Sequence, residues 1–254
     1  MPEPVYVFVV KGDRPVVLHP FEPSNPVFDD PSALALRGRY GTGESPGDAD
    51  SLRSMLYAEM EKGARRHFVD KGFYARLFLT AGVFLAVYLF LSIVVRDPVP
   101  LVDELLLGGL AATAVYLVGE RRAVASPRHG ASVLQLRRSL DTAFFAESRV
   151  VDLVEAWRDE SLSLGPAAFY RNGRETGDVT LSPDEAEEAR ALCAYLSRRW
   201  KSQPVLAELY AATVKGIPPG RLLDRALRRL GTEDMALAIA YFRLLGLVSR
   251  ETGA

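Results

Sequence analysis

The sequence predicts a mainly α-helical membrane protein, with a two-helix transmembrane hairpin, a small N-terminal β-hairpin segment and a C-terminal helical cytoplasmic domain. Three observations predict this class. Residues 77–95 form an apolar run without a charge, residues 101–118 form a second and weaker run, and basic residues flank the pair. A helix of about 20 apolar residues matches a hydrocarbon core of roughly 30 Å.

The first apolar run predicts a transmembrane helix over residues 73–95. Within residues 77–95 only Thr80 and Ser92 carry hydroxyl groups. Pro98 and Pro100 follow, and two prolines so close together end a helix because proline lacks the backbone donor and clashes with the preceding turn. We therefore assign residues 96–100 to a short outer loop.

The second apolar run predicts a transmembrane helix over residues 101–119. Asp103 and Glu104 lie near its start, where carboxylates favour the positive end of the helix dipole. The simpler interpretation is a helix start at the membrane surface. The alternative is a polar membrane site for a proton or a cation at the tip of the hairpin, because an acid inside a membrane segment is a functional hypothesis by default.

The distribution of lysine and arginine predicts the direction of insertion. Between the two runs only Arg96 is basic, whereas both outer flanks carry several basic residues. Lys and Arg accumulate on the cytoplasmic side of a membrane. We therefore expect an integral protein of the plasma (inner) membrane with both termini in the cytoplasm. The flanking residues are Arg53, Lys62, Arg65, Arg66, Lys71 and Arg76 before the hairpin, and Arg121, Arg122, Arg128, Arg137 and Arg138 after it.

Small residues recur at helical spacing in both predicted spans. Gly82 and Ala86 form one such pair in the first span, and the second span has Gly108 with Ala112 as well as Gly109 four residues before a threonine. Small residues let helix backbones approach closely, and lipid supplies no hydrophobic drive for helices to associate. These residues predict either packing within one hairpin or an interface between copies of the chain.

The segment 1–49 predicts a cytoplasmic β-hairpin followed by a proline-rich linker. Residues 5–10 and 16–18 are rich in β-branched and aromatic side chains and flank a turn-like sequence. Prolines at every third position of residues 20–26 are typical of a stiff linker or of a polyproline II segment that an aromatic groove binds. Residues 38–50 are rich in Gly, Ser, Pro and Asp and predict a flexible loop.

Two amphipathic helices are expected next to the membrane. Apolar residues at spacings of three and four predict a juxtamembrane helix over residues 50–72. In the cytoplasmic segment 120–160, a heptad-like pattern predicts one long helix over residues 132–159. We expect this long helix to pack against the juxtamembrane helix or against the domain that follows.

Residues 161–181 predict a linker, and residues 182–254 a helical domain. Ser182, Pro183 and Glu185 form the signature of a helix start with a capping box. Pro204 opens a further helix, and Gly231 ends the one after it. The last helix, 235–248, is apolar nearly all round, so it is expected in the centre of the domain or in an interface. The candidate interaction face consists of Leu222, Leu223, Leu227, Leu237 and Phe242.

The last thirty residues resemble the end of a winged helix-turn-helix domain. Residues 222–230, a turn, a second helix and residues 245–250 follow that pattern. The resemblance implies a membrane-bound regulator that meets DNA. The second helix, however, carries Met235, Ala236, Leu237 and Ala238 where base contacts need Arg, Asn or Gln. The sequence therefore does not favour nucleic acid as a partner.

Composition and motifs indicate no catalytic chemistry. The 254 residues carry a net charge of −1, one cysteine (Cys193) and three separated histidines. One cysteine permits no internal disulfide, and no Cys/His spacing is typical of a zinc site. Nucleophile, kinase and dinucleotide signatures are absent from the sequence. We expect no enzyme activity, catalytic residue, cofactor or metal.

These observations predict a two-pass membrane-anchored adaptor or scaffold whose cytoplasmic helices bind a protein partner or assemble with copies of themselves. Membrane lipid is the other expected partner. The alternative is a small oligomeric transport or channel subunit, with Asp103 and Glu104 at the mouth of its pore.

Overall fold

The computed structural model describes residues 5–11, 16–29, 34–37, 46–95, 102–142, 146–172, 179–215 and 220–252. They form a mostly helical chain with one three-stranded sheet, divided into two compact units. Unit 1 takes in Met1–Pro20, Ala33–Asp50 and Ala143–Ala254, and unit 2 takes in Phe21–Ser32 and Ser51–Thr142. The predicted turn at 12–15, most of the predicted loop 38–50 and the predicted outer loop 96–100 lie outside the described residues.

The sheet of unit 1 has the strand order β2-β1-β3. Strand β1 (Val5–Val10) pairs antiparallel with β2 (Val16–Leu18), and Phe8 lies opposite Leu18, which confirms the predicted hairpin. Strand β3 (Leu34–Arg37) was not predicted and pairs parallel with β1. All residues of β1 after Val5 are buried, so the hairpin is an inner part of unit 1.

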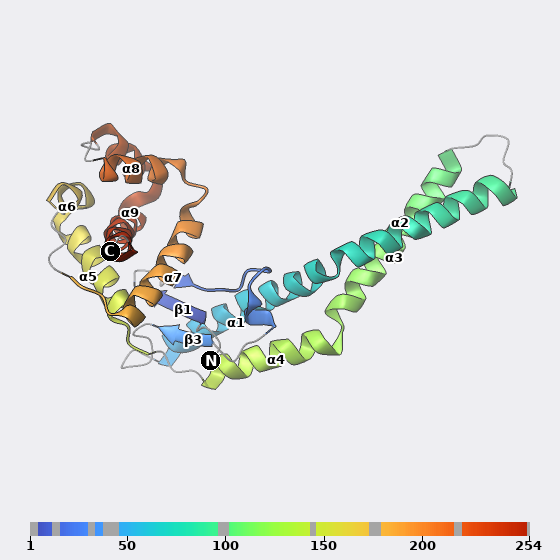
Figure 1. Cartoon of the computed structure of the whole chain (residues 1–254), viewed down its shortest axis with the longest axis horizontal. Helices are drawn as coiled ribbons and strands as arrows, with labels where there is room; N and C mark the ends of the chain where they lie inside the picture. The colour runs from blue at the N-terminus through green and yellow to red at the C-terminus, as the bar shows by residue number, and fades with distance from the viewer. Residues whose placement is uncertain are drawn as a thin grey trace. The chain divides into compact units, whose positions relative to one another are not determined.

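Five helices complete the described part of unit 1 (Figure 1). Their bounds are α5 (Arg149–Leu164), α6 (Pro166–Asn172), α7 (Pro183–Trp200), α8 (Pro204–Val214) and α9 (Gly220–Thr252). The predicted capping box at the start of α7 is confirmed, since the Ser182 hydroxyl accepts from the Glu185 amide and the Glu185 carboxylate accepts from the Ser182 amide. Gly231 divides α9 in two with a φ of +80°, which confirms the predicted helix end at this glycine.

One hydrophobic core holds unit 1 together. The second half of α9 is its centre, where Met235, Ala238 and Leu244 have no exposed surface. Phe8 of β1 belongs to the same core and packs edge-on against Tyr195 of α7 at 6.1 Å between ring centroids. The N-terminal hairpin and the C-terminal helices therefore fold as one unit, although more than 100 residues separate them in the chain.

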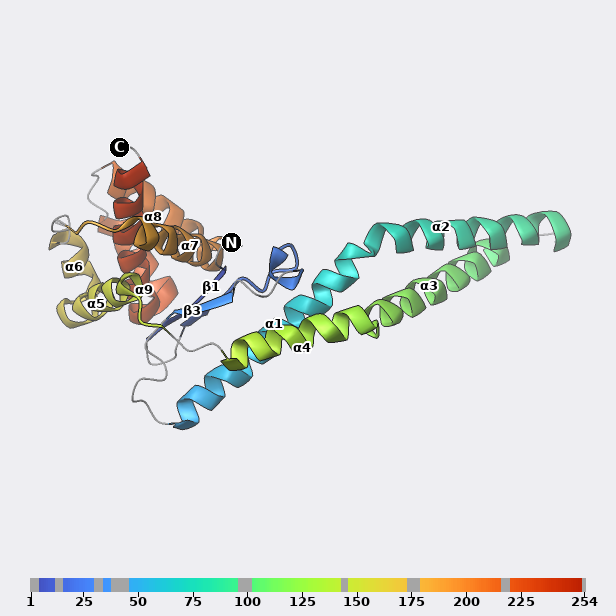
Figure 2. The same cartoon turned by 60° about the horizontal axis from the view of Figure 1, so that its bottom comes forward.

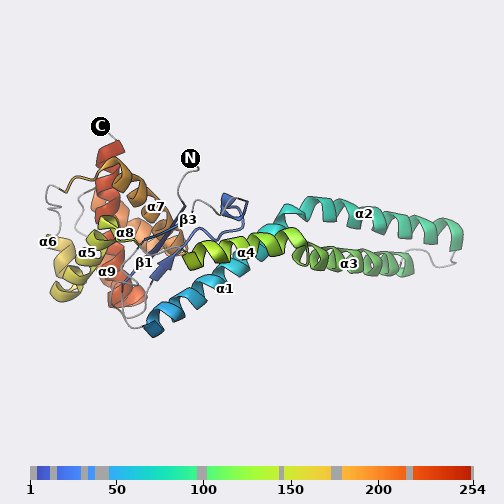
Figure 3. The ribbon, with the colours of Figure 1, turned by 90° about the horizontal axis from the view of Figure 1, so that it is seen from below.

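Unit 2 consists of two pairs of antiparallel helices. Helix α2 (Phe73–Phe90), which continues as a π-helical turn over Leu91–Val95, lies side by side with α3 (Val102–Val124) (Figure 2). Helix α1 (Pro46–Lys71) pairs with α4 (Pro127–Thr142) (Figure 3). Met60 of α1 and Leu136 of α4 are fully buried, and Arg137 forms an ion pair with Glu61. The predicted juxtamembrane helix thus has an intramolecular partner.

The single long helix predicted over residues 132–159 is wrong. Helix α4 ends at Thr142, and α5 begins at Arg149. Ser148 has an extended backbone (φ −131°, ψ 119°), and its hydroxyl accepts a hydrogen bond from the amide of Val151. An N-cap of this kind satisfies a free amide and fixes a helix start. The heptad-like pattern therefore runs across two separate helices, α4 of unit 2 and α5 of unit 1.

The linker or polyproline interpretation of residues 20–26 is also wrong. The amide of Asn25 donates to the carbonyl of Glu22, and Pro26–Phe28 forms a short 3-10 helix, η1. Phe21, Val27 and Phe28 are buried in unit 2. Burial of these apolar side chains accounts for the compact turn, because an extended segment would leave them in water.

Candidate functional site: the apolar hairpin and its base

The outer surface of the α2–α3 hairpin is apolar. Among the described residues, all exposed large apolar side chains lie on α2, its π turn or α3, except Met55, Leu134 and Leu164. Phe78 is 76% exposed, and none of the residues in the most apolar window of α2 is buried. Both helices are long and apolar enough to cross a membrane. Soluble monomers rarely expose so large an apolar patch, and a core helix of a soluble protein would be covered.

The inner seam of the hairpin is built on Gly108 and Ala112. Both residues are buried, and a methyl group added at Gly108 would lie 3.2 Å from the ring of Phe84. The Phe84 ring stacks in turn on Tyr88, at 6.2 Å between centroids. Two of the five small residues singled out by the sequence therefore bring α3 close to α2.

The other three small residues lie on the outside of the hairpin. Gly82 and Ala86 are exposed on α2. An added methyl at Gly82 or at Gly109 would meet no atom within 4 Å. The Thr113 hydroxyl donates to the carbonyl of Gly109 at 2.8 Å, within its own helix. These residues do not contribute to packing between α2 and α3.

The candidate polar membrane site is divided between two environments. Asp103 is exposed, whereas Glu104 is 5% exposed in the first turn of α3. Both carboxylates thus have the position that the helix dipole favours. The contact of Phe84 with Gly108 closes the centre of the hairpin, so a conducting path would need more than one copy of the chain.

The base of the hairpin holds a buried arginine that sequence reasoning assigned only to the basic flank. Arg76 lies in the first turn of α2 and is 8% exposed. Its Nη2 donates to the carbonyl oxygen of Val69, and its Cζ lies 5.8 Å from the centre of the Tyr116 ring. A methyl at Gly119 would lie 3.0 Å from Arg76 Cδ, so that glycine admits the side chain.

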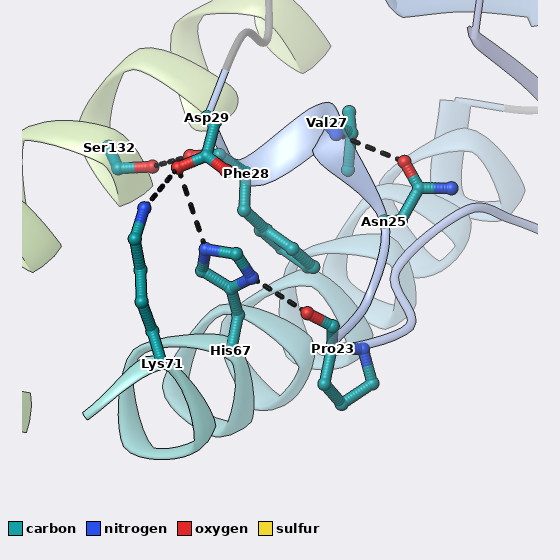
Figure 4. Close-up of polar contacts among 8 residues, drawn as sticks. All are labelled: Pro23, Asn25, Val27, Phe28, Asp29, His67, Lys71 and Ser132. Atoms are coloured by element: carbon teal, nitrogen blue, oxygen red, sulfur yellow. Dashed lines mark hydrogen bonds and ion pairs between the residues drawn. The ribbon is translucent and has the colours of Figure 1, made fainter. Parts of the chain in front are cut away.

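A short segment, Phe21 to Asp29, lies against α1 and α4 close to the base of the hairpin, and we call it the clamp (Figure 4). The Ser132 hydroxyl of α4 donates to the carbonyl of Phe28 at 2.9 Å. On the side of α1, the Nδ1–H of His67 donates to the carbonyl of Pro23 at 2.7 Å. The clamp therefore binds both α1 and α4, next to the end of each helix that adjoins the hairpin.

Asp29 adds a charged contact to the clamp. Its carboxylate accepts a hydrogen bond from Lys71 Nζ at 2.8 Å and lies 3.7 Å from His67 Nε2. The hydrogen bond from Lys71 is the main reason that the pKa of Asp29 is lowered. A lowered folded pKa stabilises the fold above the unfolded value of about 4, and this contribution is lost as the pH falls through the folded value. The side chain is 56% exposed, so the effect is small.

We expect Gly63→Ala to destabilise the clamp. A methyl group there would lie 2.8 Å from Phe28 Cζ and closer still to the carbonyl oxygen of Phe21, so the segment must shift away from α1. Overpacking of this kind costs about 1–3 kcal/mol. The measurement is thermal unfolding of the full chain, combined with limited proteolysis that detects cleavage within residues 21–29.

Gly130→Ala provides the matched control, because an added methyl at Gly130 of α4 meets no atom within 4 Å. Alanine there is expected to stabilise the helix by about 0.5–1 kcal/mol. Equal effects of the two substitutions on unfolding would contradict the role assigned to Gly63.

The candidate interaction face of unit 1 lies in its core. Leu223, Leu237 and Phe242 are buried, and Leu222 and Leu227 are partly buried against the same core. They are therefore not exposed for docking. The solvent-facing side of the first half of α9 carries arginines instead. The exposed ones are Arg221, Arg225, Arg228 and Arg229.

The acidic residues at the start of α7 have structural partners. Glu188 binds Arg37 Nε at 2.6 Å and accepts from the Ser148 hydroxyl, which ties α7 to β3 and α5. Glu185 completes the capping box, and its pKa is lowered mainly by the hydrogen bond from the Ser182 amide. No group of three His, Cys, Asp or Glu residues in the described part of the chain could hold a metal ion.

Cys193 is a core residue of unit 1. It is 6% exposed on α7, and burial raises the pKa of its thiol to about 12. Because the thiolate is the reactive form, such a cysteine is chemically inert in the folded state.

Comparison of the chain with protein-family models, with curated proteins and with solved structures gives no match. The clamp and the burial of Arg76 were not predicted from the sequence. The signal for the clamp was present, since Phe21, Val27 and Phe28 are apolar residues within a segment otherwise rich in proline and polar residues.

Proposed function

We propose that this protein is a two-pass membrane-anchored adaptor. The α2–α3 hairpin lies in the plasma (inner) membrane, and both termini lie in the cytoplasm. The observation that carries this proposal is the concentration of exposed apolar side chains on α2 and α3. Each such side chain gains about 1.5–3 kcal/mol on removal from water, and a bilayer removes all of them at once.

The cytoplasmic partner surface is the exposed arginine face of α9, and it fits an acidic protein surface. Arg221 lies in the first turn of its helix, where a cation opposes the helix dipole, so helix stability does not account for it. Arg225 lies one turn further along and is 4.0 Å from Glu208, a distant and exposed ion pair that contributes little. These charges are more consistent with recognition than with stability of the fold.

The test is chemical cross-linking in intact cells, followed by purification of the full chain from detergent extract. We expect a second chain, or a further copy of this one, in the purified material. Recovery of the protein always alone and monomeric would remove the proposal. The double variant Arg221→Glu and Arg225→Glu should lower the yield of cross-linked complex at least about tenfold, because reversed charge repels an acidic partner.

Lys201→Glu together with Arg250→Glu is the matched control. Both residues are exposed in unit 1, and the pair changes the net charge by the same amount. The control should leave the yield of complex within about twofold of the original chain, since rim charges away from a contact have small effects. Arg250 lies at the far end of α9, so an equal loss in both double variants would mean that the arginine face in the first half of α9 has no special role.

A further inference from the structure

The base of the hairpin contains a cation that is buried without an anion. Arg76 is 8% exposed, and its Nε is buried without a hydrogen-bond partner. No carboxylate in the described part of the chain forms an ion pair with it. Its only hydrogen-bond acceptor there is the carbonyl of Val69.

Such a charge is unfavourable unless it is paired. The free energy needed to remove a guanidinium from water is larger than the favourable interaction with a single carbonyl and a single aromatic ring. A guanidinium has donors arranged to bind two oxygens of a phosphate or a carboxylate at once. The Nε of Arg76 is one of these donors. The side chain is therefore preorganised for an oxyanion that comes from outside the chain.

The residues around Arg76 indicate which kind of anion it binds. The side chain packs against Gly119, and Arg122 follows on α3 one helical turn later, after Arg121; both of these arginines are exposed. Tyr74, which is 72% exposed, lies in the same first turn of α2. Arginines and tyrosines at the end of an apolar span are typical of the level at which lipid headgroups lie.

We propose that Arg76, with Arg121 and Arg122, binds the phosphate of an anionic lipid headgroup. This inference depends on the proposed membrane anchoring. The apolar faces of α2 and α3 next to the site would contact the acyl chains of the same lipid, which favours a lipid over a free phosphate ion. Arg76 supplies the buried and oriented donors, whereas Arg121 and Arg122 supply positive charge at the surface.

The test uses the full chain in a neutral detergent and native mass spectrometry with dioleoyl phosphatidylglycerol at increasing concentration. We expect Arg76→Gln to weaken the apparent affinity at least about tenfold, the effect of losing a charge-assisted contact. The apparent affinity of Arg76→Lys should lie between those of Arg76→Gln and the original chain. Lysine keeps the charge but lacks the planar donors that bind two oxygens at once. Arg250→Gln, which changes an exposed arginine of unit 1 outside the arginine face of α9, should stay within about twofold.

The variant Arg121→Gln with Arg122→Gln changes only exposed side chains, so folding is not at risk. It should also weaken phosphatidylglycerol binding, by about fivefold or more. Unchanged affinity in this variant and in Arg76→Gln would overturn the inference, and so would an equal loss in Arg250→Gln.

Two further measurements distinguish an anionic lipid from a neutral lipid and from a soluble anion. Phosphatidylcholine at the same concentrations should bind more weakly by about tenfold, and millimolar inorganic phosphate should not displace phosphatidylglycerol. Displacement by inorganic phosphate would assign the site to a soluble anion and contradict the lipid. Sedimentation of each variant with the membrane fraction reports on anchoring separately, so loss of lipid selectivity and loss of anchoring can be told apart.

Discussion

We expect the double variant Leu85→Arg and Leu89→Arg to be almost absent from the membrane-integrated fraction. Both side chains lie near the middle of the α2 span and are 55% and 51% exposed. An arginine at the centre of a span makes insertion less favourable by about 3 kcal/mol. Two of them should remove most of the free energy that keeps α2 in the bilayer. The measurement is the share of full-length chain that resists extraction from membranes at alkaline pH.

A matched control distinguishes a membrane from an ordinary protein surface. Leu134 of α4 and Leu164 of α5 are each 53% exposed, so Leu134→Arg with Leu164→Arg places the same charges at equally exposed leucines. In water an exposed leucine tolerates arginine within about 0.5 kcal/mol. The control should therefore stay in the membrane fraction, and equal behaviour of the two double variants would mean that α2 is not in lipid.

Substitution of Gly108 by leucine is expected to separate α2 from α3. A single added methyl already lies 3.2 Å from the Phe84 ring, and a leucine needs far more room than that contact leaves. Overpacking at a helix contact costs about 1–3 kcal/mol. Titration of the full chain in mixed micelles with a denaturing detergent should give this loss in the free energy of unfolding.

Gly109, the next residue of α3, provides the matched control for Gly108→Leu. A side chain at Gly109 would point away from α2, where no atom lies within 4 Å. Gly109→Leu adds the same volume to the same helix one residue further along, and we expect it to change the free energy of unfolding by less than about 0.5 kcal/mol. If Gly109→Leu proved the more harmful of the two, this glycine would lie in a contact between copies of the chain.

The sequence was sufficient wherever the structure depends on local patterns. The apolar runs predicted two helices that are long enough for a bilayer, because hydrophobic length is a property of consecutive residues. The capping box at Ser182 and the helix end at Gly231 were also predicted, since each depends on only a few neighbouring side chains. Pairing of β1 with β2 requires only a short turn between them.

Contacts between distant segments could not be predicted in the same way. Strand β3 has only four residues and is defined by parallel pairing with β1, nearly 30 residues earlier. The clamp contains two prolines, Pro23 and Pro26, and a third precedes it, a spacing that indicated a linker. Its compact form depends on contacts with the distant residues His67 and Ser132 and on burial of its apolar side chains. The break between α4 and α5 was hidden because each helix continues the same apolar spacing.

Only part of the candidate site could be predicted, because which face of a helix is covered also depends on contacts between distant segments. Helical spacing identified the small residues of the spans, but it could not tell the inner face, with Gly108, from the outer face, with Gly109. The leucines of α9 were recognised as an apolar face, and the structure covers that face with the rest of unit 1. Arg76 counted as one of several flanking cations until its burial between α2 and α3 separated it from them.

The central claim is that α2 and α3 form a hairpin that crosses the membrane and returns. Cys193 makes a direct measurement practical, because burial and a thiol pKa of about 12 keep it unreactive toward maleimides in the folded chain. A new cysteine is therefore the only reactive thiol, either in the predicted outer loop (Asp97→Cys) or on the exposed surface of unit 1 (Arg229→Cys).

A maleimide that cannot cross membranes is added to intact cells, or to spheroplasts if the cell envelope excludes it, and then to lysed cells. We expect the Asp97→Cys variant to be labelled from outside, and the Arg229→Cys variant to be labelled only after lysis. Labelling of Arg229→Cys from outside, or protection of Asp97→Cys until lysis, would contradict the hairpin and its orientation.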